Sequence, residues 1–259
     1  GAVPDLRRDQ CAWYVVDEAY QSALALNPRL AYLEFIAKNV GVRRARGRFV
    51  LTSNCDVFLG RHVLDVLAAG ALEPRVLYRA ARHDLKLGSA SDGLSWEVLE
   101  DARNLDGRVK VLKPPFMGGG TGDFILLDRE TYHELRGFNE IYRVARFGID
   151  FNFLVQAYCA GVPIRDIGGP VYHVNHVGSY RLNARMYAGR EGEAHYGRSR
   201  WPSRSIVYAN PPSWGLVTSV ERAIGPAAWA LDFSWDAVPP MVNLQGVVRP
   251  GAEMGLTGD

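Results

Sequence analysis

Short apolar runs alternate with amphipathic helical segments over residues 12–174, and this alternation limits the possible folds more than any other feature. The run RFVLTS, residues 48–53, is typical of a buried strand. Before it, apolar residues recur at helical spacing from Phe35 to Ala45. Gly47 is expected to end that helix. Strands that alternate with helices predict an α/β protein with a sheet of mixed strand direction.

The same patterns predict further elements along the chain. Helices are expected over residues 17–26, 60–70, 95–103, 129–137 and 149–160, and strands over residues 12–16, 75–85, 164–167 and 171–174. Residues 117–128 are expected to form a glycine-rich turn that leads into a strand. From about residue 197 the chain becomes rich in tryptophan and proline. Linkers are not rich in tryptophan, so residues 197–259 are predicted to form an extension that packs on a domain of residues 1–196.

Length, charge and cysteine content exclude several classes of protein. A chain of 259 residues that is 47% hydrophobic and 22% charged can bury a sizeable core. Its 30 basic and 28 acidic residues give a net charge of only +2, so no nucleic-acid partner is expected. No apolar run is long enough for a transmembrane segment. Three widely spaced cysteines favour a reducing, cytoplasmic location over a disulfide framework.

Two short stretches could form a binding site, and each also has a purely structural interpretation. Asn54 and Asp56 follow the strand 48–53 at its carboxyl end, which is where ligands bind in open α/β sheets. The alternative is a turn or a helix cap. Residues 118–124, GGGTGDF, could let the backbone approach a ligand closely, or they could form an ordinary turn.

Two other stretches could carry catalytic or metal-binding groups. Asp150 opens the predicted helix 149–160, where it would either cap the helix or take part in chemistry. His173 and His176 stand at the end of a predicted strand. Such a His-x-x-His pair can bind a divalent metal, although each imidazole could instead be hydrogen-bonded in a core.

In this order, the four stretches resemble the glycosyltransferases of the GT-A fold, the nucleotide-diphospho-sugar transferases related to family 2. The segments that carry the resemblance are AKNVGVRRARGRFVLTSNCD, GGGTGDFILLDRETYHELRGFNEIY, FGIDFNFLVQAYCAG and PVYHVNHVGSY. They fall within residues 34–180. The resemblance implies a GT-A-like, Rossmann-like fold with a mixed, mostly parallel sheet flanked by helices.

The sequence departs from the family pattern in three places. Asn54 replaces the first acid of the family's Asp-x-Asp, and Ile149 replaces the glutamate of its Gly-Glu-Asp. The usual amino-terminal strand and helix, which hold the nucleotide base, are not recognisable before residue 12. Because the chain begins with Gly1, it is expected to be a processed product or a fragment that lacks part of the nucleotide-binding region.

The resemblance also implies a metal site. Asp56 would be the carboxylate ligand, with His176 as the second ligand and His173 as the reserve. A carboxylate with an imidazole suits Mn²⁺ (manganese), whereas oxygen ligands alone would suit Mg²⁺. The cation would neutralise the charge that develops on the departing nucleoside diphosphate.

Roles for the donor and the acceptor follow from the same resemblance. The residues expected to contact the donor are Lys38, Asn39, Arg43, Arg44, Asn54, Gly119, Gly120 and Asp123. Asp150 would be the general base that takes the proton of the acceptor hydroxyl, and its place at a helix N-terminus favours the carboxylate form. The resemblance makes an inverting mechanism the default.

The predicted function is therefore metal-dependent transfer of a sugar from a UDP- or GDP-sugar to a hydroxyl of a glycan, lipid or small molecule. One alternative is a catalytically inactive scaffold of the same fold that binds a sugar or a nucleotide. A second is a nucleotidyltransferase. That class would need a glycine-rich loop bearing Arg or Lys near the first strand, and the sequence shows none there.

Overall fold

A computed structural model describes residues 11–25, 33–86, 95–110, 112–141, 143, 148–174 and 209–238. The chain divides into two compact units. The first unit contains Gly1–Ala45, Arg136–Ile149 and Tyr187–Asp259, and the second contains Arg46–Leu135 and Asp150–Met186. The boundary predicted at residue 196 lies outside the described residues, so that division stays a prediction.

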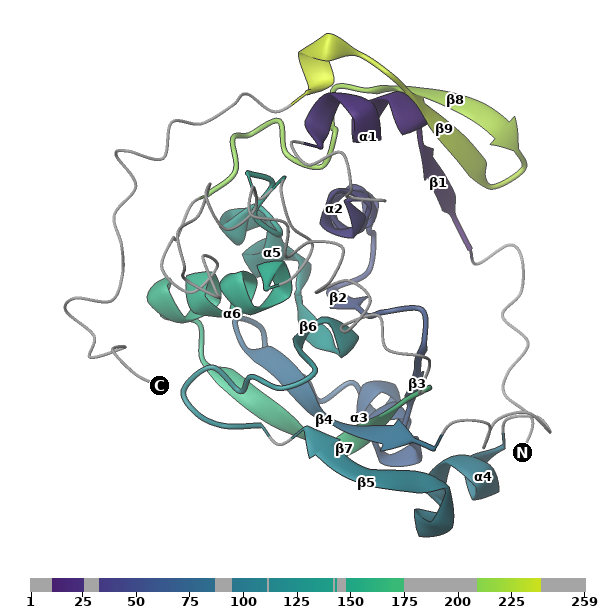
Figure 1. Cartoon of the computed structure of the whole chain (residues 1–259). Helices are drawn as coiled ribbons and strands as arrows, with labels where there is room; N and C mark the ends of the chain where they lie inside the picture. Colours follow the sequence, from purple (N-terminus) through teal and green to yellow (C-terminus); the bar gives the residue numbers. More distant parts are fainter. Residues whose placement is uncertain are drawn as a thin grey trace, which may run out of the picture. The chain divides into compact units, whose positions relative to one another are not determined.

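A mixed six-stranded sheet forms the centre of the second unit (Figure 1). Its strands are β2 (Phe49–Thr52), β3 (Val57–Leu59), β4 (Leu77–Leu85), β5 (Leu105–Lys110), β6 (Ile125–Asp128) and β7 (Ile164–His173). They lie in the order β2-β6-β4-β7-β3, with β5 paired to β4. Only the β4–β7 pair is parallel among these strands. A mixed α/β fold is confirmed, whereas the expectation of a mostly parallel sheet is wrong.

The direction of β6 explains that error. All four of its residues are buried and the first three are apolar, and such a run is typical of a parallel sheet covered on both faces. Here β6 runs antiparallel to both of its neighbours, β2 and β4. As a result β2, β4 and β7 share one direction, and their carboxyl ends lie at the same edge of the sheet as the amino end of β6.

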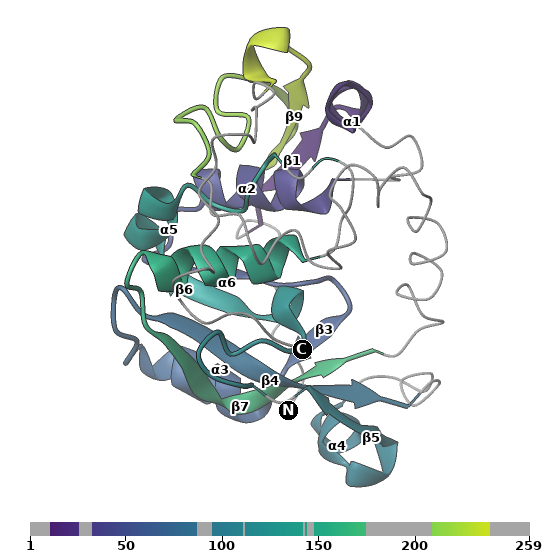
Figure 2. The same cartoon turned by 60° about the vertical axis from the view of Figure 1, so that its left-hand side comes forward.

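Helices cover both faces of this sheet. In Figure 1 and Figure 2, α3 (Arg61–Ala69) lies on one face, and α5 (Arg129–Leu135) and α6 (Ile149–Cys159) lie on the other. Gly70 ends α3 in the left-handed conformation, with a φ of 65°. In the described residues, no helix is both long and apolar enough to cross a membrane.

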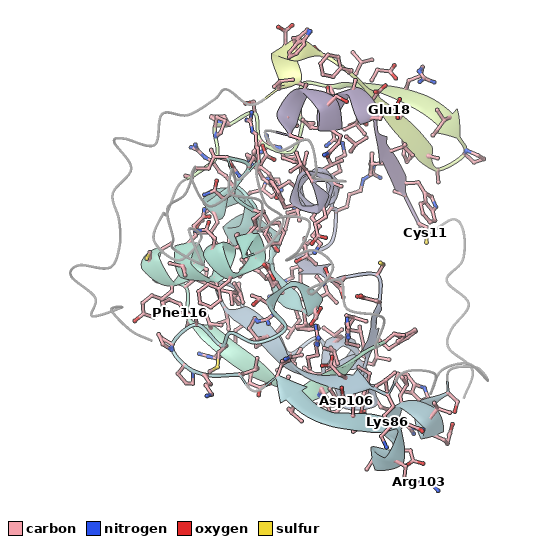
Figure 3. The ribbon with its side chains drawn as sticks, viewed as in Figure 1. Cys11, Glu18, Lys86, Arg103, Asp106 and Phe116 are labelled. Atoms are coloured by element: carbon pink, nitrogen blue, oxygen red, sulfur yellow. The ribbon has the colours of Figure 1, made fainter. Side chains whose placement is uncertain are left out.

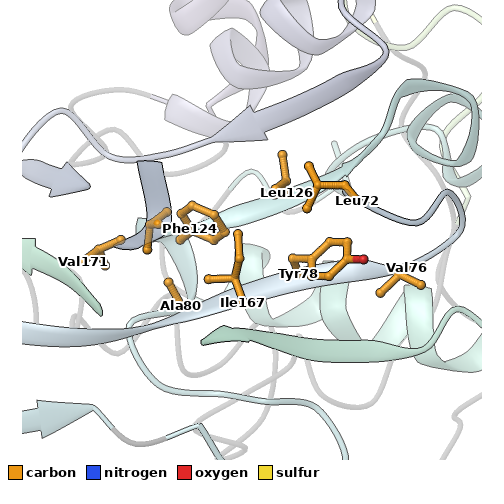
Figure 4. Close-up of a cluster of buried hydrophobic side chains, with 9 residues drawn as sticks. Leu72, Val76, Tyr78, Ala80, Phe124, Leu126, Ile167 and Val171 are labelled. Atoms are coloured by element: carbon orange, nitrogen blue, oxygen red, sulfur yellow. The ribbon is translucent and has the colours of Figure 1, made fainter. Parts of the chain in front are cut away.

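The core of the second unit joins α3 to the sheet. Val63, Tyr78, Phe124 and Val171 belong to one cluster of buried side chains (Figure 4). On the opposite face, the Tyr132 ring stacks on Phe153 with its centroid 4.9 Å away. These contacts fix the strand ends that carry the polar groups described below.

A short helix, α4 (Trp96–Glu100), and a 3₁₀ turn, Ala102–Asn104, precede β5. Figure 3 labels Lys86 and Arg103 in this region. Lys86 Nζ donates to the Arg103 carbonyl at 2.6 Å, and Arg103 pairs with Asp101 at the same distance. These exposed contacts tie the end of β4 to the segment before β5.

The predicted helices and the longer strands are present, and the differences are local. Residues 164–173 form one strand, not two short ones, because β7 passes through Gly168 at a φ of 92° with its pairing to β4 shifted nearby. Helix α2 (Glu34–Arg44) ends at an extended Ala45, so Gly47 is not its cap. The sequence did not predict β3 and β5, since one is very short and the other is polar.

The first unit contains a three-stranded sheet of β1 (Trp13–Val16), β9 (Ala228–Asp232) and β8 (Val220–Gly225). Strand β9 pairs with β1 in parallel and with β8 in the antiparallel direction. Helices α1 (Glu18–Leu24) and α2 belong to the same unit. The described part of the predicted extension, residues 209–238, therefore supplies two strands of this sheet, of which β9 pairs with the amino-terminal strand.

A buried polar network holds residues 138–140 in the first unit. The Asn39 side chain is fully buried, and its Nδ2 donates to the Phe138 carbonyl and to Glu140 Oε1, both at 2.8 Å. Asn39 Oδ1 accepts from the Phe138 amide at 2.8 Å. Glu140 Oε1 also accepts from the Gly215 amide at 2.9 Å. Asn39 and Glu140 thus link α2 to two later segments of the chain.

Glu140 makes the stability of the first unit depend on pH. Burial raises the pKa of its carboxyl from 4.5 to about 6, against the opposing effect of the hydrogen bonds from Asn39 and Gly215. A folded-state pKa above the unfolded value favours folding at low pH. We expect its contribution to the free energy of unfolding to fall by about 2 kcal/mol as pH rises from about 4.5 to about 6.

Glu140→Gln keeps an acceptor oxygen and cannot ionise, so it should remove this part of the pH dependence. Urea unfolding of both proteins at pH 4.5 and pH 7 measures the difference. Identical changes in the two proteins would contradict the assignment to Glu140.

Candidate functional site

Polar side chains from distant parts of the sequence meet at the edge where β2, β4 and β7 end. In the sheet register, Thr52 at the end of β2 is opposite Ile125 at the start of β6. His173 at the end of β7 is opposite both Asp84 and Val57. The sheet itself therefore places the residues after β2 beside the ends of β4 and β7.

The His173 imidazole lies between two carboxylates. Its Nε2 is 3.3 Å from Asp56 Oδ2, and its Nδ1 is 3.1 Å from Asp84 Oδ1. The side chains of His173 and Asp84 are 11% and 8% exposed, whereas that of Asp56 is 29% exposed. Asp56 is thus the member of this group that solvent or a ligand reaches most easily.

Arg82 connects the group of Asp56, Asp84 and His173 to a second polar group, which contains Asp123. Its Nε donates to Asp84 Oδ1 at 2.7 Å, and its Nη1 donates to Asp123 Oδ2 at 3.0 Å. Burial alone would lower the pKa of the Arg82 guanidinium, but Asp123 and Asp84 together raise it above its usual value. The arginine is therefore a permanent positive charge between two nearly buried carboxylates.

Asp123 is held from the other side by residues that follow β2. Asn54 Nδ2 donates to Asp123 Oδ1 at 2.9 Å, and Ser53 Oγ donates to the Asp123 carbonyl at 2.8 Å. The two oxygens of this carboxylate thus have different partners, an amide on Oδ1 and a guanidinium on Oδ2.

Polar side chains lie close against the glycine-rich loop at Gly120 and Gly122. A Cβ on Gly122 would lie 3.1 Å from both Asn54 Nδ2 and Asp150 Oδ2, so these two side chains flank this glycine. A Cβ on Gly120, where φ is 54°, would lie 2.6 Å from Asp123 Oδ2. The loop therefore brings Asp150, at the start of α6, to the same edge of the sheet.

Arg79 is fully buried and organises the loop from inside. Its Nη1 donates to the Thr121 carbonyl at 2.8 Å, and its Nη2 donates to Gly119 and Gly120 at 3.0 Å each. The carbonyls of Met117 and Phe124 also accept from this guanidinium. The Arg79 side chain thus donates to five carbonyl groups within residues 117–124.

Burial lowers the pKa of the Arg79 guanidinium to about 10, while Asp150 and Asp123 act in the opposite direction. The group is charged at neutral pH. Asp150 and Asp123 are thus the two carboxylates that most stabilise this buried positive charge.

The structure brings together most of the predicted site residues of the second unit. Asn54, Asp56, Asp123, Asp150 and His173 all belong to the arrangement described above. His176 lies outside the described residues. Gly119 and Gly120 use their carbonyls to bind Arg79, and their expected contact with a donor sugar stays a prediction.

Four predicted donor contacts lie on α2 in the first unit, where each has a partner. Lys38 is 3.4 Å from Glu34, and Asn39 is in the buried network with Glu140. The Arg43 guanidinium lies over the Trp214 ring, and Arg44 donates to Glu221 at 2.6 Å. Their role towards a donor stays a prediction.

Sequence reasoning missed Arg79, Arg82 and Asp84. All three lie in β4, the strand LYRAARHDL. Charged residues inside a strand that also contains Leu77 and Leu85 were the available signal, because buried charges in a sheet require partners.

Asp56 and His173 are a pair that could hold a divalent cation. Oxygen and nitrogen ligands lie about 2.1 Å from such an ion, so neighbouring ligands are about 3 Å apart. The 3.3 Å between Asp56 Oδ2 and His173 Nε2 agrees with that spacing. Asp84 lies at the other ring nitrogen, where carboxylates commonly support a ligating histidine.

Within the described residues, no three His, Cys, Asp or Glu side chains converge on one ion position. A cation held by this pair would complete its coordination with water, with ligand oxygens or with residues outside the described part. Mg²⁺ and Mn²⁺ sites that also bind substrate phosphates are commonly of this open kind.

No protein family model matches the chain. A comparison with proteins of curated function also finds no significant match.

Proposed function

We propose that the chain is a glycosyltransferase with a GT-A-like site, which moves a sugar from a UDP- or GDP-sugar to an acceptor hydroxyl. One observation carries the proposal. The stretches that carry the sequence resemblance in the second unit lie at one edge of its sheet: Asn54 and Asp56, the glycine-rich loop, Asp150, and His173. Ligands of open α/β sheets bind outside such strand ends.

In this proposal Asp56 and His173, the reserve ligand of the sequence prediction, hold the divalent cation, Mn²⁺ or Mg²⁺, and Asp84 Oδ1 lies 3.1 Å from the other ring nitrogen. When bound, the cation supplies positive charge to the phosphate oxygens of the departing nucleoside diphosphate. The greater exposure of Asp56, 29% against 8% for Asp84, leaves this carboxylate accessible to a ligand.

Asp150 acts as the general base. Its carboxylate takes the proton of the acceptor hydroxyl while the hydroxyl oxygen bonds to the anomeric carbon of the sugar, and the sugar–phosphate bond breaks. Asp150 stands in the first turn of α6, and its carboxylate attracts the buried Arg79 guanidinium. Because residue 122 is a glycine, it has no side chain that could cover Asp150 Oδ2.

The cation site can be tested without knowing the donor. Mn²⁺ at 100 times its Kd should stabilise the wild-type chain by about 2.7 kcal/mol. For a chain of this size, each kcal/mol raises the melting temperature by about 2–4 °C. Asp56→Ala should remove this rise. Asp65→Ala, an exposed aspartate on α3 in the same unit, is the matched control and should keep it.

A full Mn²⁺ response in Asp56→Ala, or no response in the wild-type chain, would contradict the cation site. A panel of UDP- and GDP-sugars with Mn²⁺ then identifies the donor by its thermal shift. Binding of a donor without release of the nucleoside diphosphate in the presence of varied acceptors would favour the inactive scaffold over the enzyme.

A further inference from the structure

Asn54 occupies the position of the first acid in the family's Asp-x-Asp, and its contacts show why an amide is needed there. We propose that Asn54 is a positioning residue whose NH₂ group holds Asp123 in place beside Asp150, so that an aspartate at position 54 would damage the site. Only the comparison with Asp-x-Asp rests on the proposed function. The contacts themselves do not.

The first step concerns the hydrogen bonds that the buried Asp123 carboxylate needs. Its carboxylate is 2% exposed, so water cannot satisfy both oxygens. Arg82 donates to Oδ2 at 3.0 Å, and Asn54 Nδ2 donates to Oδ1 at 2.9 Å. An amide can donate to a carboxylate, whereas an ionised carboxylate can only accept.

The second step is the position of Asp150. Asn54 Nδ2 and Asp150 Oδ2 lie at equal distances, 3.1 Å, from the Cβ position of Gly122, and Asn54 Oδ1 is 3.3 Å from it. An aspartate at 54 would place one oxygen against Asp123 Oδ1 and would add its charge on the side where Asp150 lies. Like charges at such distances repel each other strongly.

The third step is the charge of the whole group. The contacts described above bring together the carboxylates Asp56, Asp84, Asp123 and Asp150 and the guanidinium groups Arg79 and Arg82. The four carboxylates and two guanidinium groups of this set sum to two negative charges. A carboxylate at 54 would leave three.

The test is a double-mutant cycle in metal-free buffer at pH 7.5. Asn54→Asp should lower the melting temperature by about 4–8 °C, and by more than Asn54→Ala, which removes the donor without adding charge. In the Asp123→Asn background the amide and the carboxylate exchange places. In that background, Asn54→Asp should therefore lower the melting temperature by less than half of its effect in the wild-type chain.

Asn104→Asp is the matched control, because the Asn104 amide donates to a carbonyl, that of Val98, at 3.0 Å. Its effect should be the same in the wild-type and the Asp123→Asn backgrounds. A melting temperature that is unchanged or higher in Asn54→Asp, or an equal loss in both backgrounds, would overturn the proposal.

Mn²⁺ titration separates this proposal from the proposed function. Asn54→Asp should bind Mn²⁺ with an affinity within tenfold of the wild-type value, because Asp56 and His173 hold the cation in the proposed function and residue 54 is not a ligand. Binding that is tenfold tighter would show that residue 54 is a metal ligand position and would overturn the role given to the amide. If the wild-type chain binds no Mn²⁺, the cation site fails, and the melting-temperature cycle still decides the role of Asn54.

Discussion

Asp150→Asn is expected to reduce the rate of sugar transfer by about 10²- to 10⁴-fold, which is the usual contribution of a general base. Asparagine keeps the shape of the side chain and can still accept hydrogen bonds at the start of α6, but it cannot take a proton. The free energy of unfolding should therefore stay within about 1 kcal/mol of the wild-type value. Turnover of the donor found in the thermal-shift panel and urea unfolding measure the two quantities.

The control is Asp65→Asn, the same change on the exposed face of α3, which should leave the transfer rate unaltered. Near wild-type transfer by Asp150→Asn would mean that another group removes the proton. Easy unfolding of the variant with no separate effect on catalysis would mean that Asp150 acts only as a helix cap. An alanine variant could not distinguish these outcomes, since it loses the cap in either case.

The largest effect on stability is expected at Arg79. Arg79→Met removes the charge and leaves five carbonyl groups without their donor, and a loss of about 3–5 kcal/mol is typical when one side of a buried charged network is removed. Arg79→Lys keeps the charge but has only three N–H donors and no planar fork, so its loss should be intermediate. Urea unfolding gives both values.

Hydrogen exchange provides a second measurement for the same residue. The amides of residues 118–122 should exchange faster in Arg79→Lys, because the loop carbonyls are no longer fixed. Arg75→Lys is the matched control, since Arg75 is 58% exposed in its pair with Glu134. Its stability should change by less than about 0.5 kcal/mol. Equal effects of the two lysine variants would contradict the role of Arg79 in the loop.

The sequence predicted which segments form helices and strands better than it predicted how the strands are arranged. Periodic apolar residues identify α3 and α6, and an apolar run identifies β6. Such an apolar run is expected in a parallel and in an antiparallel sheet alike once helices cover both faces of the sheet. The direction of β6 between β2 and β4 depends on long-range pairing, which the local pattern does not contain.

The candidate site shows the same division. Motif order predicted Asp56, Asp150 and, as the reserve to His176, His173, because each follows or opens an element with a recognisable pattern. Arg79 could not be identified in this way, since its partners are loop carbonyls about 40 residues later in the chain. Asn39 lies in a basic helix, where the sequence predicts a donor contact. The fold adds what the sequence did not predict, that its amide is buried against Phe138 and Glu140.

The pairing of β1 with β9 determines when the first unit can assemble during protein synthesis. Tyr20, just after β1, accepts a hydrogen bond from the amide of Ser234, 214 residues later. At about 5–20 residues per second, the ribosome needs about 10–40 s to make that stretch. The second unit is complete by Met186, so its sheet can form while β8 and β9 are still being translated. During that interval β1 is an unpaired strand, and we expect it to be the segment of the nascent chain most exposed to chaperones or to pairing with other chains.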